Sequence, residues 1–207
     1  MSFLLPIFLV SILSSRAFWN DACPYPSMDV FQLAPNHVWK AAPGCRILVV
    51  DNGGLRCDIP HDWIVYSPGT HVFAIDRFPP ENRSLMAISC RRVSSEVIAI
   101  PLQLVLEEWV LAEDRRVVER SEPVRFYRWP LQAAWMQLRV TDSDPRRDKS
   151  TRVCVARADR TQALVILDFP SVDEPSVEGA WQTLMDTLVV GDYIADPATG
   201  KRRMQRG

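Results

Sequence analysis

The sequence has few of the residues that metal centres and disulfide frameworks need. It contains three histidines and five cysteines among 207 residues. No two cysteines form a CxxC pair, and no histidine lies at a zinc-ligand spacing from another possible ligand. The odd number of cysteines also argues against a complete disulfide framework. We therefore expect no metal ion and no cofactor.

The sequence also lacks the common motifs of nucleotide-binding proteins and hydrolases. The glycine-containing stretch DNGG at 51–54 is not followed by GK[ST], and neither a GxSxG nor a GxGxxG pattern occurs. A net charge of -1 gives no electrostatic reason to expect nucleic acid as a partner. Cys57 is expected to be a buried strand residue rather than a nucleophile, because it alternates with apolar neighbours.

The remaining candidates for acid–base chemistry are His61, Asp62 and His71. His61 and Asp62 are adjacent in a turn after a proline, where neighbouring side chains usually point apart, so we expect a solvated turn. A small-ligand-binding protein or hydrolase with a pocket near these three residues is kept as the alternative to a non-catalytic protein.

No apolar run is long enough to span a membrane. The longest, Phe3–Leu13, has eleven residues, whereas a transmembrane helix needs about 20. It resembles the apolar region of a secretory signal, with small residues at Ser15 and Ala17, but no Lys or Arg precedes it. Residues 1–17 are therefore either a signal peptide or an apolar lead. The sequence is compatible with export to the periplasm or secretion and equally with a cytoplasmic location. If the protein is exported, Cys23 and Cys45 are the best-placed pair for a disulfide.

Glycine is scarce, with eight residues against sixteen prolines. Four of these prolines fall in residues 18–45, which show no helical or strand period and are expected to be irregular. Residues 46–192 are predicted to form a single domain, because no linker interrupts them. Residues 193–207 are predicted to be a basic C-terminal tail.

Several segments alternate with the period of a β-strand. Residues 46–50 and 55–59 flank an Asn-Gly turn, with Leu55, Cys57 and Ile59 on one face. Pro60 ends this hairpin, and Trp63 is expected to anchor the core below it. Further strands are predicted at 71–78, 84–93, 122–142 with a bend at Pro130, 150–158 and 161–169.

Two segments show helical spacing instead. The first starts at Pro101 and is predicted to end near Arg115–Val118, and the second begins at Asp173–Pro175 with Gly191 as a C-cap. Short turns between strands imply an antiparallel sheet. The predicted fold class is therefore α+β, an antiparallel sheet flanked by two long amphipathic helices (an α/β/α sandwich). The apolar positions are Leu102, Val105, Leu106 and Trp109 in the first helix, and Val177, Ala180, Trp181, Leu184 and Leu188 in the second.

This arrangement resembles the PsbP-like superfamily, which includes PsbP proteins of photosystem II, a Ran-binding nuclear import factor, bacterial envelope proteins and type VI effector-associated chaperones. The resemblance spans roughly residues 46–192. It is carried by CDIPHDWIV at 57–65, by the helix with Trp109, and by AWQTLMDTLVVGDYI at 180–194. These motifs mark packing rather than chemistry, so no site residue is carried over from the family.

The resemblance and the lack of a convergent polar site favour a non-catalytic module that binds, assembles or chaperones a protein partner. A chaperone of the type VI kind, shielding an apolar helix, would be cytoplasmic. Arginine and aromatic residues are enriched at the centres of protein interfaces. The candidate partner surface consists of Tyr127, Trp129, Trp135, Arg146 and Arg147.

Overall fold

A large antiparallel sheet dominates the computed structural model, which describes residues 37, 39–68, 71–79, 81–141, 148–191, 194–196 and 201–202. The eight-stranded sheet is antiparallel at every pairing, as expected for strands joined by short turns. Its strands, in spatial order, are β3 (Ile64–Tyr66), β4 (Val72–Ile75), β5 (Leu85–Arg92), β10 (Thr161–Pro170), β9 (Asp148–Ala158), β8 (Leu131–Thr141) and β6 (Arg116–Arg120), and β7 (Val124–Arg128) also pairs with β8.

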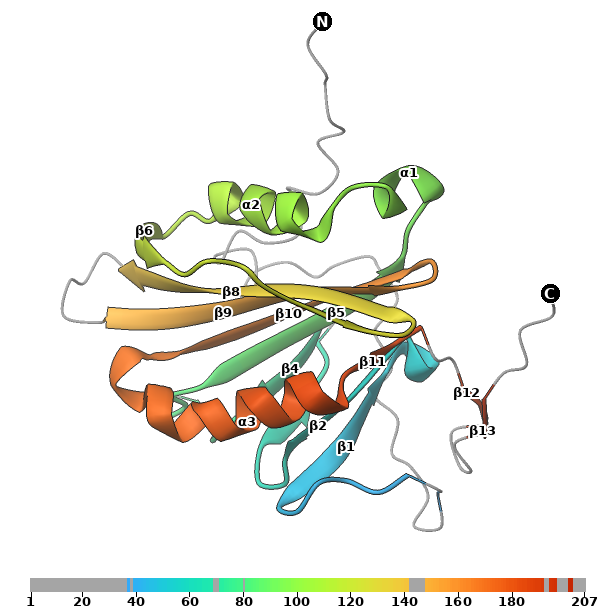
Figure 1. Ribbon diagram of the computed structural model, residues 1–207. Helices are drawn as coiled ribbons and strands as arrows, with labels where there is room; N and C mark the ends of the chain where they lie inside the picture. Colours follow the sequence, from blue (N-terminus) through green and yellow to red (C-terminus); the bar gives the residue numbers. More distant parts are fainter. Residues whose placement is uncertain are drawn as a thin grey trace, which may run out of the picture.

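A second, three-stranded sheet lies below one face of the large sheet (Figure 1). The predicted hairpin is confirmed as β1 (Cys45–Val50) and β2 (Leu55–Pro60), joined by a 3-10 turn at Asp51–Gly53. Strand β11 (Val189–Val190) adds to the free side of β2. Near the C-terminus β12 (Ile194–Asp196) pairs with β13 (Lys201–Arg202).

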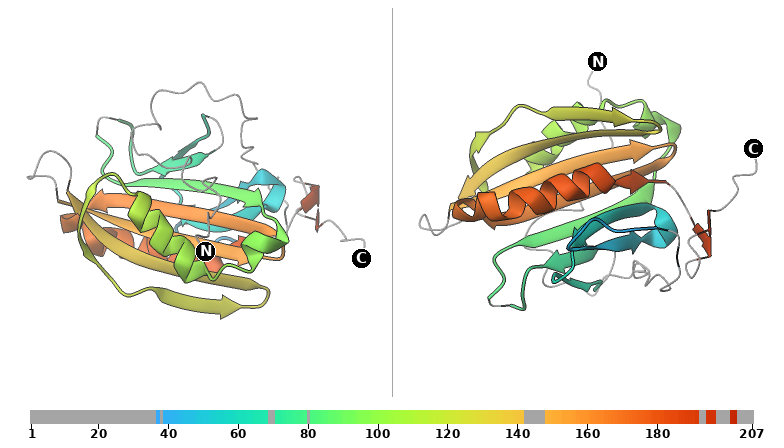
Figure 2. Two further views of the ribbon diagram at one scale, coloured as in Figure 1. Left: turned by 90° about the horizontal axis from the view of Figure 1, so that it is seen from above. Right: turned by 60° about the horizontal axis from the view of Figure 1, so that its bottom comes forward.

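The helices lie on opposite faces of the large sheet. Helix α2 (Leu102–Ala112) lies on one face, after the short α1 (Ser95–Ile98). Helix α3 (Glu174–Thr187) lies on the other face, next to the small sheet, as Figure 2 shows. None of the helices in these described ranges is long and apolar enough to cross a membrane.

The predicted fold class, a sheet flanked by two long helices, is wrong. Strands make up most of the described elements, and only α3, with 14 residues, is a long helix. Helix α2 has 11 residues and ends at Ala112 rather than near Arg115–Val118. The residues beyond it form β6 instead, because Val117 pairs with Val140 of β8 and valine favours the sheet.

Two apolar cores result, one on each face of the large sheet. The larger core joins α3, both sheets and Trp63, which is 7% exposed, so its predicted role as an anchor is confirmed. Leu55, Cys57 and Ile59 are fully buried in it, as their alternation predicts. The smaller core packs α2 through Trp109 against the other face.

Buried arginines fasten the ends of α2 to the sheet. Arg157 donates hydrogen bonds to the carbonyl oxygens of Ile98 (2.8 Å) and Ile100 (3.0 Å), just before the helix. After the helix, Arg115 donates to Glu113 (2.8 Å) and to Asp168 of β10 (3.1 Å). Burial opposes the charge of Arg115, but the hydrogen bonds to Glu113 and the carboxylate of Asp168 raise its pKa. Apart from the bond between Arg115 and Glu113, these contacts link residues more than 50 positions apart in sequence, so no local pattern predicts them.

Gly191 does not cap α3, contrary to the prediction, because β11 comes between them. It has a φ of 77°, and its N–H donates to the carbonyl oxygen of Gly54 (2.9 Å). A Cβ at Gly191 would lie 3.2 Å from the carbonyl oxygen of Ala158. Both the positive φ and the close approach favour glycine where β11 ends.

Candidate functional site

The β7–β8 hairpin carries two strongly exposed aromatic side chains, and one of them, Trp129, is the most exposed aromatic residue among the described residues. Trp129 lies in the turn, where the Trp129–Pro130 peptide bond is cis, and is 83% exposed. Tyr127, on β7, is 62% exposed. Exposed aromatic rings that lie close together in sequence and on one hairpin are typical of a binding surface.

The hairpin is held firmly against helix α3. Arg128 donates hydrogen bonds to the carbonyl oxygens of Asp186, Leu188 and, at 3.5 Å, Met185. A cation near the C-terminus of a helix is stabilising, because it complements the unpaired carbonyls and the helix dipole. The base of the exposed turn is therefore fixed by charged hydrogen bonds.

Trp135 has a different environment from the other two aromatic residues of the predicted surface. It is half-buried and packs against the larger core. Its ring meets Trp181 of α3 in a T-shaped contact at 5.5 Å between centroids. The structure thus brings Tyr127 and Trp129 onto the surface and places Trp135 between the sheet and α3.

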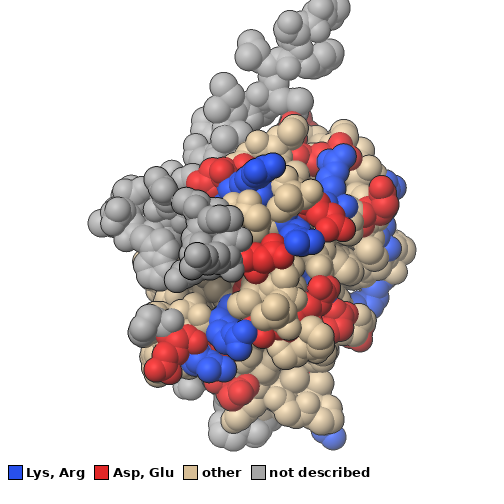
Figure 3. Space-filling view, turned by 90° about the vertical axis from the view of Figure 1, so that its left-hand side faces the viewer, with Lys and Arg blue, Asp and Glu red and all other residues tan. Residues whose placement is uncertain are grey.

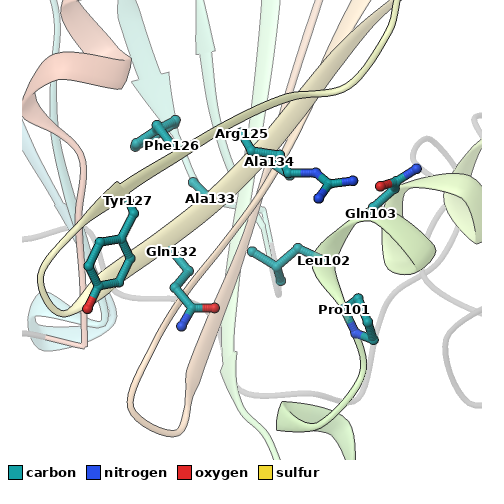
Figure 4. A pocket seen from close by; sticks show the side chains of 9 residues that line it. All are labelled: Pro101, Leu102, Gln103, Arg125, Phe126, Tyr127, Gln132, Ala133 and Ala134. Atoms are coloured by element: carbon teal, nitrogen blue, oxygen red, sulfur yellow. The ribbon is translucent and has the colours of Figure 1, made fainter.

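A hollow of about 410 Å³ lies between the start of α2 and the hairpin (Figure 4). Arg125 of β7 extends across it towards Gln103 of α2, and Tyr127 borders it. Gln103 is already bonded to Glu107 (3.0 Å). The side chain of Arg125 is exposed and makes no ion pair or hydrogen bond to any part of the chain that the structure describes. The hollow is lined by Pro101, Leu102, Gln103, Arg125, Phe126, Tyr127, Gln132, Ala133 and Ala134.

The side chains of β7 alternate between the two faces of the sheet. Arg125 and Tyr127 border the hollow on the α2 side. Phe126 is also among the lining residues but packs against the larger core, and Arg128 reaches α3. This is the period of two expected for a strand. The prediction from sequence missed Arg125, although its alternation with Tyr127 was a usable signal.

Arg146 and Arg147, the basic part of the predicted surface, lie outside the described residues. They fall between the end of β8 at Thr141 and the start of β9 at Asp148. Figure 3 views the side of the molecule that is at the left in Figure 1, and there basic and acidic residues are interspersed. One described pair, Arg139 and Asp148, joins the two strands next to this segment at 2.8 Å.

The structure does not bring His61, Asp62 and His71 together. His61 and Asp62 are exposed in the turn before β3, and His71 is half-buried at the start of β4. Because Tyr66 pairs with Phe73, His61 lies before the open end of the β3–β4 pair and His71 lies at its loop end, so the strand pair separates the two histidines. Burial lowers the pKa of His71. None of the three lines the hollow beside the hairpin.

No cluster of three or more His, Cys, Asp or Glu side chains suitable for a metal ion occurs among the described residues. Asp168 and Glu113 are engaged by Arg115, and Thr151 donates to Asp168 at 2.5 Å. These carboxylates serve the packing of α2 and β6 on the sheet. Cys23, the other half of the predicted disulfide with Cys45, lies outside the described residues.

The buried cysteines should resist alkylation in the folded protein. Burial, together with Asp51, raises the pKa of Cys90 to about 12, and burial raises that of Cys154 to about 12. Burial and Asp58 raise the pKa of Cys57. At pH 8 we expect iodoacetamide to modify these three thiols at least about 100-fold more slowly than in the unfolded chain, because little thiolate forms.

Peptide mass spectrometry of timed samples would measure these rates, with the half-buried Cys45 as a faster-reacting internal control. Modification of Cys57 at the rate of the unfolded chain would contradict its assignment as a core residue.

Comparisons with known proteins match most of the chain. A family model described as Alr1449 matches residues 46–194. The chain is 27% identical over 175 residues to the uncharacterized protein alr1449 of Nostoc sp., covering 83% of this chain and 91% of that protein. Its structure is similar to the solution structure of cyanobacterial PsbP (CyanoP) from Synechocystis sp., with a TM-score of 0.54 and 14% identity over 74% of this chain and 98% of that one. The PsbP-like resemblance is thereby confirmed at the level of the fold.

Proposed function

The chain belongs to the Alr1449 family, and we propose that it is a non-catalytic module that binds a protein partner through the β7–β8 hairpin. The observation that carries this proposal is the pair of exposed rings, Trp129 and Tyr127, on a hairpin that Arg128 fixes to α3. A rigid aromatic surface binds with little loss of side-chain entropy, so it suits protein recognition. Assembly and chaperone roles both fall within this proposal.

The hollow beside the hairpin adds to this surface. Its volume of about 410 Å³ is enough for one or two side chains of a partner, and Arg125 offers a charge there that no described group neutralises. Interfaces are strongest where an anchoring side chain enters such a hollow and the surrounding contacts exclude water. The start of α2 and the hairpin together therefore form one continuous binding surface.

A photocrosslinking amino acid at position 129 tests this proposal in cells of the source organism. We expect a discrete crosslinked product from position 129 and little from position 172, since Val172 is also 80% exposed but lies next to the start of α3. The double substitution Tyr127→Ala and Trp129→Ala should reduce recovery of that partner at least about 10-fold, because exposed aromatic anchors carry much of the binding energy.

The same double variant should keep its melting temperature within about 2 °C, since both rings are exposed. Equal crosslinking from positions 129 and 172 would contradict the proposal. Unchanged partner recovery by the folded double variant would do the same.

A further inference from the structure

Strand β7 is an open edge of the large sheet. It pairs with β8 on one side and with no other strand in the described ranges. The opposite edge of the sheet is β3, which has only three residues against five in β7. An unpaired edge presents backbone N–H and C=O groups that another extended segment can bond.

We propose that the partner adds an extended, acidic segment to the outer edge of β7. This inference rests on the proposed function, in which the β7–β8 hairpin binds a protein partner. Its backbone pairs with β7, and an acidic side chain meets Arg125 at the hollow. The five residues of β7 set the length of the segment at about five or six residues, since paired strands advance together.

The charges along this edge select an acidic occupant. Residues 116–128 contain four arginines and two glutamates, a net charge of +2 in a chain of net charge -1. Arg128 is committed to α3, and Glu119 is paired with Arg139 at 3.6 Å. Three exposed arginines, Arg116, Arg120 and Arg125, then remain along the edge against one glutamate, Glu122. The guanidinium groups of these three have no ion-pair partner among the described residues.

The same charges disfavour a second copy of this chain at the edge. Antiparallel pairing of two β7 strands about Phe126 would bring the arginines of both copies next to one another on the two paired strands. Arg125 of each copy would lie opposite Tyr127 of the other, with the second arginine on the diagonal, and like charges on neighbouring strands are destabilising. An acidic segment removes this repulsion and also neutralises Arg125.

The alternation of β7 fixes which partner side chains reach the hollow. Arg125 and Tyr127 are two residues apart on the α2 side. If an acidic residue lies opposite Arg125, the partner residue two positions along the strand lies opposite the Tyr127 ring. An apolar side chain suits that position, because it packs against the ring. The expected partner segment has an acidic and an apolar residue at alternate positions, with no proline between them.

Synthetic peptides test this inference directly on the full chain. The probe is the capped seven-residue peptide Thr-Val-Thr-Glu-Thr-Val-Thr, which has Val two positions from Glu, and the control carries Lys in place of Glu. In a ¹⁵N NMR titration we expect the Glu peptide to shift the amide signals of 124–128 and to slow their hydrogen exchange. The Lys peptide should bind at least about 10-fold more weakly, because like charges then meet at Arg125.

Two variants test whether Arg125 selects the charge of the bound segment. Arg125→Glu should reverse the preference, so that the Lys peptide binds more tightly than the Glu peptide, while Arg125→Ala should bind both peptides equally. N-methylation of alternate peptide bonds in the Glu peptide should abolish binding, since it removes the N–H groups that pair with a strand edge. Binding that survives methylation in both alternate registers would overturn strand addition.

The outcomes separate this inference from the proposed function. If no peptide perturbs 124–128 while the crosslink from position 129 persists, strand addition is overturned and the binding surface stands. If sedimentation shows that the chain dimerises and Arg125→Glu changes the dimer, a second copy is the occupant and the acidic segment is overturned. Loss of both the peptide signal and the crosslink overturns both proposals.

Discussion

Replacing Trp181 by alanine is expected to lower the free energy of unfolding by about 3–5 kcal/mol, the usual cost of removing a buried tryptophan. Trp181 is 1% exposed and is among the largest fully buried side chains. It lies on α3 against the large sheet, in contact with Trp135 at 5.5 Å between ring centroids. Its loss would leave a cavity where α3 meets the sheet, and the rigid strands around it cannot close that space.

Urea unfolding followed by circular dichroism would measure this change, and the melting temperature should fall by roughly 10–20 °C. Trp181→Phe is the matched control. The indole N–H of Trp181 is buried without a hydrogen-bond partner in the described chain, so phenylalanine removes an unsatisfied donor while it keeps most of the ring. We expect the Phe variant to lose less than half of what the Ala variant loses.

Trp129→Ala, in the exposed turn of the β7–β8 hairpin, provides the comparison with the buried Trp181 of α3. Trp129 is 83% exposed, so its removal should leave stability nearly unchanged and act only on partner binding. A Trp181→Ala variant as stable as Trp129→Ala would show that α3 is not held by this packing.

Alternation and helical spacing within short segments of the sequence correctly located individual strands and helices. The alternation of Leu55, Cys57 and Ile59 located β2, and the spacing of Leu102 to Trp109 located α2. The end of α2 was predicted wrongly, because the residues after it pair with β8 as β6, and Arg115 beside them forms an ion pair with Asp168 of β10. That contact spans 53 residues, so the helical pattern contains no sign of it.

The division of the strands into two sheets could not be predicted from local sequence patterns either. Strand β11 pairs with β2, more than 120 residues earlier in the chain, through Val190 and Leu55. Two-residue strands carry too little alternation to be recognised from sequence. At the candidate site, the aromatic character of the hairpin was evident, but the open edge of β7 depends on which strands surround it. The proposed role of Arg125 rests on that position in the sheet, not on its neighbours in sequence.

Replacing Arg152 by alanine should be the most damaging change to a charged residue in the described chain, with a loss of about 2–4 kcal/mol in the free energy of unfolding. The Arg152 side chain is 3% exposed. It donates to Gln137 (2.8 Å) and pairs with Glu174 (3.2 Å) and Glu178 (2.6 Å) of α3. Its guanidinium also lies within 5.8 Å of the ring centroids of three aromatic residues, Trp135, Phe169 and Trp181.

Packing, rather than charge, should account for most of this loss. The side chains of Glu174 and Glu178 are 43% and 53% exposed, so water can solvate both carboxylates after Arg152 is removed, and exposed pairs contribute little. The Nη1 atom of Arg152 is buried without a hydrogen-bond partner in the described chain, which itself costs stability. The aromatic rings around the guanidinium would be left facing a cavity in the alanine variant.

Arg152→Met separates the two contributions, because methionine fills a similar volume without charge. We expect the free energy of unfolding of the Met variant, measured in urea, to be within about 1 kcal/mol of the wild-type value. It should be well above the value for the Ala variant. Glu174→Gln combined with Glu178→Gln should likewise cost less than Arg152→Ala, although it removes both ion pairs. If Met destabilises as much as Ala, the two glutamates hold α3 through charge, and the assignment of this contact to packing is wrong.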